Sequence, residues 1–151
     1  MNIPLDGIIL MQIAMVLLAA FVTYKTALQI EPRIAFLSAA IILFDPPITI
    51  FSLTILSESL FLLLIAVFMY FFVIYLKGKN TGHLALSAIF LALAAYVRPV
   101  GYYLGFVLPL FILYVNRSDN LWKSLRHALI FFSGRILYYR AMADQKLYQV
   151  P

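Results

Sequence analysis

Long apolar runs separated by short polar segments dominate the chain. The runs cover residues 8–24, 34–56 with an interruption at 45–47, 60–76, 84–97 and 100–115. A transmembrane helix needs about 20 mainly apolar residues, and about 17 suffice. The pattern therefore predicts an all-α protein, a polytopic bundle of about five transmembrane helices in which the second and fourth spans are short.

Prolines interrupt the apolar pattern at two places. Asp45 is followed by Pro46 and Pro47, and Arg98 is followed by Pro99. Proline lacks an N–H group and disfavours helical backbone in the residue before it, so both sites predict a helix end or a kink. Broken helices at membrane depth are tolerated only where they face protein or a water-filled cavity. The two proline sites are therefore places to look for function.

Composition indicates which solvent surrounds the apolar runs. Hydrophobic residues make up 65% of the 151 residues, charged residues make up 11%, and the mean hydropathy is +1.01. Soluble domains are about 45–50% apolar and about 25% charged, and a soluble domain of about 150 residues buries only about 70% of its surface. The chain is therefore expected to lie in a lipid bilayer. Its net charge of +5 comes from single bases between apolar runs, which argues against a nucleic-acid partner.

Residues that usually bind transition metals are scarce. The chain has no cysteine, which excludes a disulfide framework and a thiolate metal site. His83 and His127 lie far apart and lack the spacing of a zinc motif. We expect both histidines to be loop or interface residues.

Basic residues are concentrated in alternate loops. One set of loops contains Lys25, Arg33, Lys77, Lys79, Arg117, Lys123 and Arg126. The other set contains Asp45, Glu58 and a single base, Arg98. The positive-inside rule places the basic loops in the cytoplasm, so the second set and the N-terminus are expected outside. We expect a multi-pass protein of a prokaryotic plasma membrane.

The two ends of the chain also lead to an expectation. No basic segment precedes the first apolar run, and residues 135–151 are polar and aperiodic. We therefore expect residues 1–134 to be a partial membrane domain from a larger transporter or enzyme, and residues 135–151 to be a poorly ordered tail.

Glu58 and Arg98 are the main candidates for chemistry, because charged side chains are costly in hydrocarbon. Glu58 lies between Ser57 and Ser59, where an acid and two hydroxyls would also suit an ordinary helix N-terminus. Arg98 could instead extend to lipid headgroups. As site residues, Arg98 would bind a phosphate with its planar fork. Glu58, with Asp45, would hold a divalent cation such as Mg²⁺ or Mn²⁺, or orient a sugar hydroxyl.

Two segments resemble the polytopic GT-C glycosyltransferases. They read "FDPPITIFSLTILSESLFLLL" at residues 44–64 and "LALSAIFLALAAYVRPVGYYL" at residues 84–104. The similarity is to the aminoarabinose-transferase-like enzymes and the GPI mannosyltransferases, which have a proline-ended helix, an acid that enters the next helix, and an Arg-Pro-x-Gly sequence. The resemblance covers about residues 9–115.

The resemblance implies part of a GT-C-like fold and a sugar transfer from a polyprenyl-phosphate carrier to an acceptor on the non-cytoplasmic face. It implies that Arg98 faces the carrier phosphate and that Glu58 belongs to a second acidic site. The first outer loop of the family, with its catalytic aspartate, is not found in the sequence, and Asp6 is a poor substitute. No catalytic residue is therefore assigned, and the chain is expected to be inactive alone.

Two other classes of protein stay open. A fragment of a transporter or flippase would also contain proline-broken helices, but its charged site should lie near the bilayer midplane rather than at helix ends. A non-catalytic subunit of a membrane assembly should form a complete, self-closing bundle.

Overall fold

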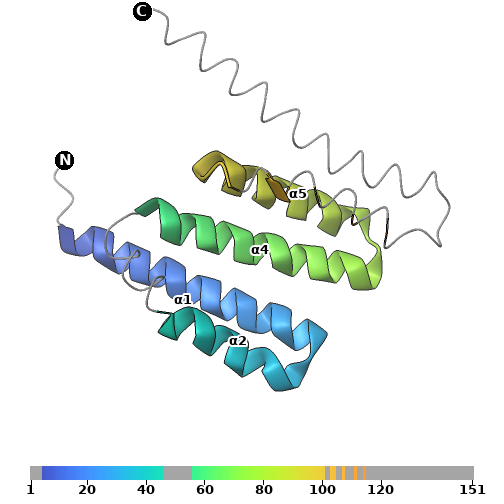
Figure 1. Cartoon of the computed structure of the whole chain (residues 1–151), viewed down its shortest axis with the longest axis horizontal. Coiled ribbons are helices and arrows are strands. Elements are labelled where there is room, and N and C mark those ends of the chain that lie inside the picture. The colour runs from blue at the N-terminus through green and yellow to red at the C-terminus, as the bar shows by residue number, and fades with distance from the viewer. Residues whose placement is uncertain are drawn as a thin grey trace, which may run out of the picture.

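The computed structural model describes residues 5–45 and 56–100, together with five single residues beyond them: Tyr103, Leu104, Val107, Phe111 and Tyr114. The regular elements in the described ranges are four helices. They are α1 (Leu5–Ile30), α2 (Pro32–Phe44), α4 (Leu56–Gly78) and α5 (Thr81–Val97), as Figure 1 shows. The predicted all-α class is confirmed.

Two of these helices have the length and composition of membrane spans. The qualifying segments are Gly7–Ile30 in α1 and Ser57–Gly78 in α4. The helices Pro32–Phe44 and Thr81–Val97 are apolar but shorter. The described part of the second predicted span and the fourth predicted span are thus short, as expected. The fifth predicted span, at 100–115, and the predicted tail, at 135–151, fall largely or wholly outside the described residues.

The first helix continues beyond its predicted end at residue 24. Lys25 is helical, and its Nζ lies 5.4 Å from the ring centroid of Phe21, one turn earlier. A single lysine does not stop a helix, because its long stem can follow apolar surface to a polar layer. α1 ends only before Glu31, since Pro32 disfavours helical backbone in the residue before it. The predicted loop at residues 25–33 is therefore reduced to a sharp reversal at Glu31.

The first part of the second predicted span is described, and it forms α2. α2 ends at Phe44, and Asp45 has extended backbone with φ −71° and ψ 112°, as expected for a residue before proline. Residues 46–55 lie outside the described residues, and Leu56 is the first residue of α4. The third and fourth predicted spans, at 60–76 and 84–97, correspond to α4 and α5, which both begin a few residues earlier than predicted.

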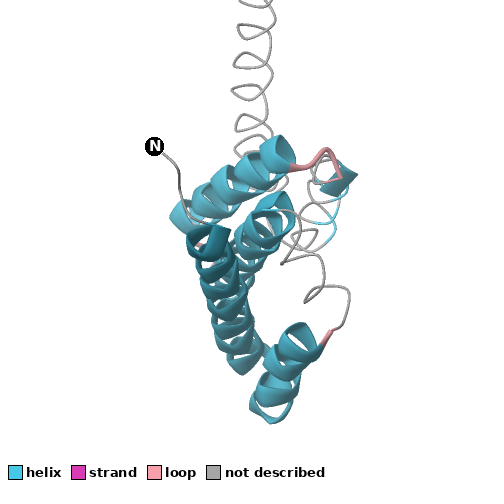
Figure 2. Cartoon of the chain, turned by 90° about the vertical axis from the view of Figure 1, so that its left-hand side faces the viewer, coloured by secondary structure: helices cyan, strands magenta, loops and turns pink. Residues whose placement is uncertain are grey.

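The four helices form an open row in the order α2, α1, α4 and α5. Contacts join α1 to α2, α1 to α4, and α4 to α5, and the end-on view in Figure 2 shows the same order. α1 and α4 run in one direction, whereas α2 and α5 run in the other (Figure 1). Asp45, Glu58 and Arg98 consequently lie toward one end of the row, here called the Glu58 end. The opposite end is called the Lys77 end.

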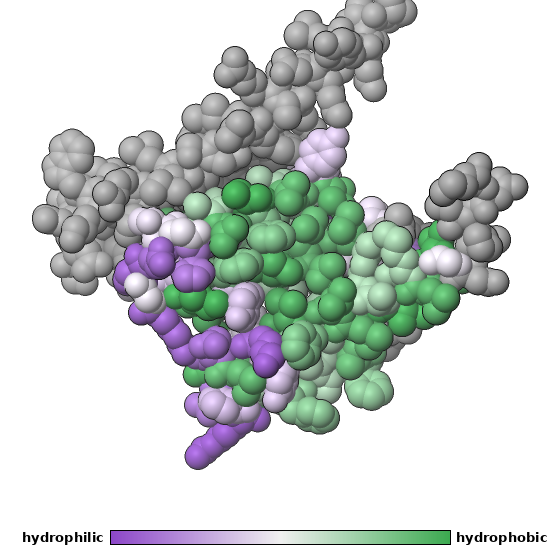
Figure 3. Space-filling model, turned by 180° about the vertical axis from the view of Figure 1, so that it is seen from behind, coloured by the Kyte–Doolittle hydropathy of each residue, from purple (hydrophilic) through white to green (hydrophobic). Residues whose placement is uncertain are grey.

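Polar residues gather at the Lys77 end, and an apolar surface covers the helices between the two ends (Figure 3). Exposed polar residues near this end include Glu31, Arg33, Lys77, Lys79 and Asn80. The exposed large hydrophobic residues include Leu17, Phe21, Phe36 and Ile41. A surface of this kind is the one that a lipid bilayer would solvate, since lipid tails are as apolar as these side chains.

A tight turn holds α4 and α5 antiparallel. The N–H of Lys79 donates to the carbonyl of Tyr75 at 2.7 Å, and Lys79 has a φ of 51°, the left-handed geometry that often ends a helix. Asn80 then caps α5, because its Oδ1 accepts from the N–H of Gly82 at 2.8 Å. The turn therefore sets which residues of the two helices face each other.

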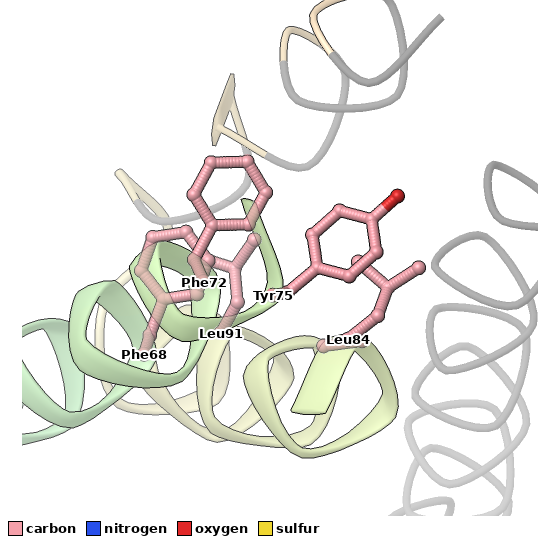
Figure 4. Close-up of a cluster of buried hydrophobic side chains, with 6 residues drawn as sticks. Phe68, Phe72, Tyr75, Leu84 and Leu91 are labelled. Atoms are coloured by element: carbon pink, nitrogen blue, oxygen red, sulfur yellow. The ribbon is translucent and has the colours of Figure 1, made fainter. Parts of the chain in front are cut away.

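Aromatic side chains pack between α4 and α5. The buried cluster consists of Phe68, Phe72, Tyr75, Leu84, Ala88 and Leu91 (Figure 4). Phe68 and Phe72 stack with centroids 5.7 Å apart, and Phe71 stacks on Phe90 across the two helices, also at 5.7 Å. Such pairs contribute about 0.5–1.5 kcal/mol beyond the area they bury. The cluster fixes the register of the hairpin.

Replacing Phe72 by alanine should destabilise the protein much more than the same change at Phe36. Phe72 is 4% exposed inside the α4–α5 cluster, whereas Phe36 is 79% exposed on α2. Loss of a buried phenyl ring costs roughly 3 kcal/mol or more. Thermal unfolding in detergent should show a clearly lower midpoint for Phe72→Ala and little change for Phe36→Ala. Equal shifts would contradict the role given to the cluster.

Candidate functional site

Glu58 occupies the first turn of α4. An acid in this position is stabilised by the partial positive charge of a helix N-terminus. The segment Ser57-Glu58-Ser59 thus begins a helix, as the sequence predicts. Its first residues face the Glu58 end of the row, beside the last turn of α5.

Arg98 terminates α5. Its N–H donates to the carbonyl of Ala94 at 2.9 Å, and its backbone is extended with φ −141° and ψ 128°. Pro99 accounts for this geometry, because proline disfavours helical backbone in the residue before it. The cation therefore lies at a helix C-terminus, where the helix dipole favours positive charge.

Glu58 and Arg98 form a direct ion pair. The Nη2 atom of Arg98 donates to Oε1 of Glu58 at 2.6 Å, and the two residues are 40 positions apart in the sequence. The distribution of basic residues in the sequence predicts that both residues lie on one face of the membrane, and the structure brings them into contact at one end of the hairpin. The short donor–acceptor distance is typical of a charge-assisted hydrogen bond.

The ion pair is only partly shielded. The side chain of Arg98 is 40% exposed and that of Glu58 is 20% exposed. Ion pairs with substantial exposure stabilise proteins by about 1 kcal/mol or less. The aromatic cluster between α4 and α5, rather than this pair, therefore holds the hairpin together, and the pair can open without loss of the fold.

Asp45 lies toward the same end but on a different part of the row. It is the C-cap residue of α2, and among the described helices α2 packs against α1 rather than against α4 or α5. The described helices therefore bring Glu58 and Arg98 together, whereas Asp45 belongs to a helix that packs against α1. The predicted pairing of Asp45 with Glu58 stays a prediction.

The described residues contain no group of three or more histidine, aspartate or glutamate side chains that could hold a metal ion. One oxygen of Glu58 accepts from Arg98. The predicted divalent cation stays a prediction.

Two buried polar atoms lack hydrogen-bond partners in the part of the chain that the structure describes. They are Oγ of Ser59, a residue that is 2% exposed, and Nδ1 of His83. His83 lies in the first turns of α5 and stacks on Phe71 with ring centroids 6.3 Å apart. This placement agrees with the prediction that His83 is an interface residue. Ser59 follows Glu58 directly, so the unpartnered hydroxyl lies in the same helical turn as the ion pair.

An apolar groove of about 310 Å³ lies on the other side of α4, between α1, α2 and α4. Its floor includes Thr26 and Ala27, and its walls include Ile34 and Ala66. Oγ1 of Thr26 donates to the carbonyl of Val22 at 2.8 Å and is therefore satisfied within its own helix. The groove offers packing surface and no charged group.

The sequence did not predict a direct bond between Glu58 and Arg98. Two features of the sequence could have predicted this bond. Each residue has the charge that complements the dipole of the helix end it occupies. In addition, the start of one helix and the end of the next must lie close together if the loop that joins the two helices is short. The aromatic cluster at the interface was also missed, because nearly every position of α4 is apolar and the sequence does not separate lipid-facing residues from buried ones.

Comparison with known proteins identifies one family that the chain matches. Residues 2–138 match the dolichyl-phosphate-mannose-protein mannosyltransferase family. No curated protein and no solved structure matches the chain significantly. The matched segment covers most of the chain and includes every described helix, with Glu58 and Arg98. The chain therefore belongs to the dolichyl-phosphate-mannose-protein mannosyltransferase family, whose members are membrane glycosyltransferases of the GT-C type.

Proposed function

We propose that the protein acts in the transfer of a sugar from a polyprenyl-phosphate carrier to an acceptor on the non-cytoplasmic face of a membrane. The family supports this donor class, because its description names a mannose carried on dolichyl phosphate. The observation that supports a site for the donor is the charged pair of Glu58 and Arg98 at one end of the bundle.

Arg98 is proposed to bind the carrier phosphate. In the transfer, a hydroxyl oxygen of the acceptor attacks the anomeric carbon and loses its proton to a base that is not among the residues assigned to the site. The bond between that carbon and the phosphate oxygen breaks, and the phosphate leaves with the electron pair. A guanidinium beside the leaving phosphate stabilises the negative charge that develops on it. Its planar fork of N–H donors matches the geometry of phosphate oxygens.

Glu58 is proposed to orient a sugar hydroxyl near that phosphate. A carboxylate accepts hydrogen bonds from hydroxyl groups through either of its oxygens. The 20% exposure of its side chain leaves it partly accessible at the end of α4. Asp45 is a weaker candidate for the same role, since it lies on α2 and not on the α4–α5 hairpin.

The orientation follows from the two ends of the row. Lys77 and Lys79 lie at the turn between α4 and α5, and Arg33 lies at the reversal between α1 and α2. The positive-inside rule would place this Lys77 end in the cytoplasm and the Glu58 end outside. Donor and acceptor would then meet at the outer leaflet, where the carrier phosphate would be within reach of the hairpin end.

Replacing Arg98 by alanine should weaken the binding of dolichyl phosphate about ten-fold or more, since hydrogen bonds to charged groups contribute roughly 1.5–3 kcal/mol. Lys77→Ala is the matched control, because it removes one positive charge from the other end of α4. Affinity should be measured with the purified chain in lipid nanodiscs, and transfer of labelled mannose from dolichyl-phosphate-mannose should be followed in membranes that contain the protein.

Lys77→Ala should remain within about two-fold of the wild-type affinity, because Debye screening removes interactions between exposed charges that lie so far apart. Comparable losses in both variants, at equal protein levels, would remove Arg98 from the donor site.

A further inference from the structure

We propose that Glu58 is the resident counter-ion of Arg98, which an incoming phosphate must displace, and that Glu58 thereby selects lipids that carry a phosphate. This inference rests on the proposed function, because it takes Arg98 as the ligand of the carrier phosphate. The inference also gives the ion pair a role of its own, because the contact between Glu58 and Arg98 must open when the phosphate of the lipid binds.

The geometry leaves Arg98 open to a second anion. Within the described residues, the bond to Glu58 uses the Nη2 atom of Arg98. A guanidinium has five N–H donors in one plane. Because the side chain of Arg98 is 40% exposed, a phosphate can approach it while Glu58 is still bound. Exchange of one anion for the other therefore needs no unfolding of the hairpin.

The phosphate of dolichyl phosphate is the stronger of the two competing anions. This monoester carries about −1.5 to −2 charges at pH 7 and three acceptor oxygens, whereas a carboxylate carries a single charge, as does the phosphodiester of a sugar-loaded carrier. Both groups favour the same N–H donors of arginine. A neutral lipid alcohol has no charge with which to displace Glu58, so the closed pair excludes it.

Glu58 still has a favourable electrostatic contact after a phosphate has displaced it from Arg98. The carboxylate lies in the first turn of α4, where the N-terminus of the helix supplies partial positive charge. A carboxylate released beside the bound phosphate is free to accept a hydrogen bond from the sugar that the phosphate carries.

The pair should lower the affinity for the donor by a measurable factor. A ligand that binds only the open form has its affinity reduced by the fraction of molecules in that form. Since a partly exposed ion pair favours the closed form by about 1 kcal/mol or less, its removal should raise the affinity for dolichyl phosphate about two- to six-fold.

The test is the binding of dolichyl phosphate to the full chain in nanodiscs of neutral phosphatidylcholine, with Glu58→Gln and Glu58→Asp compared with the wild type. We expect Glu58→Gln to bind about two- to six-fold more tightly, and Glu58→Asp, which keeps the charge but has a shorter reach, to bind with an intermediate gain. Dolichol, which lacks the phosphate, should be excluded by the wild type and should gain affinity for Glu58→Gln, because the closed pair is then absent.

Glu31→Gln is the matched control. It removes one negative charge from an exposed glutamate at the opposite end of the row. A general gain from the higher net charge would appear in this variant too, whereas loss of the counter-ion should appear only at Glu58. Thermal unfolding checks that each variant folds, and Glu58→Asp decides the question if Glu58→Gln does not fold.

The outcomes separate this inference from the proposed function. If Arg98→Ala loses binding while both Glu58 variants bind no more tightly than the wild type, the donor site stands and the displacement of Glu58 is refuted. If Arg98→Ala binds dolichyl phosphate as the wild type does, the proposed function itself fails. A gain in Glu58→Gln without one in Glu58→Asp would indicate charge repulsion alone and would also overturn the inference.

Discussion

The antiparallel packing of α4 against α5 is the constraint on which the candidate site depends. The tight turn at Lys79 and Asn80 and the aromatic cluster around Phe72 fix the register of the two helices. With the register fixed, the first turn of α4 and the end of α5 must lie side by side. Glu58 and Arg98 meet for this reason, and their bond of 2.6 Å is a consequence of the packing rather than its cause.

Each charge of the pair is stabilised twice. Glu58 lies at a helix N-terminus and Arg98 at a helix C-terminus, so each complements the dipole of its own helix as well as its partner. An isolated charge at the end of an apolar bundle would be costly, and the two favourable contacts of each charge reduce this cost. Either group therefore keeps one favourable contact when it changes partners, which a site that exchanges anions requires.

The sequence predicted the helical class, the short second and fourth spans and the shared end of Glu58 and Arg98, because these follow from hydropathy, proline positions and the distribution of bases. It misplaced the end of α1, since Lys25 looked like a boundary although only Pro32 stops the helix. It could not identify Phe68 or Phe72 as buried, because lipid-facing and buried positions are equally apolar in a membrane helix. The contacts between side chains depend on the register of the packed helices, and the hydropathy pattern of the sequence does not determine that register.

Sidedness is the most direct test, because the account requires both ends of the charged pair to face one side of the membrane. The chain has no cysteine, so single cysteines can be introduced beside the pair at Ser57 and Val100, and at Gly78, where a side chain has open space. A membrane-impermeant maleimide added to intact cells should label positions 57 and 100, and position 78 only after permeabilisation. Labelling of positions 57 and 100 from opposite sides would contradict the account.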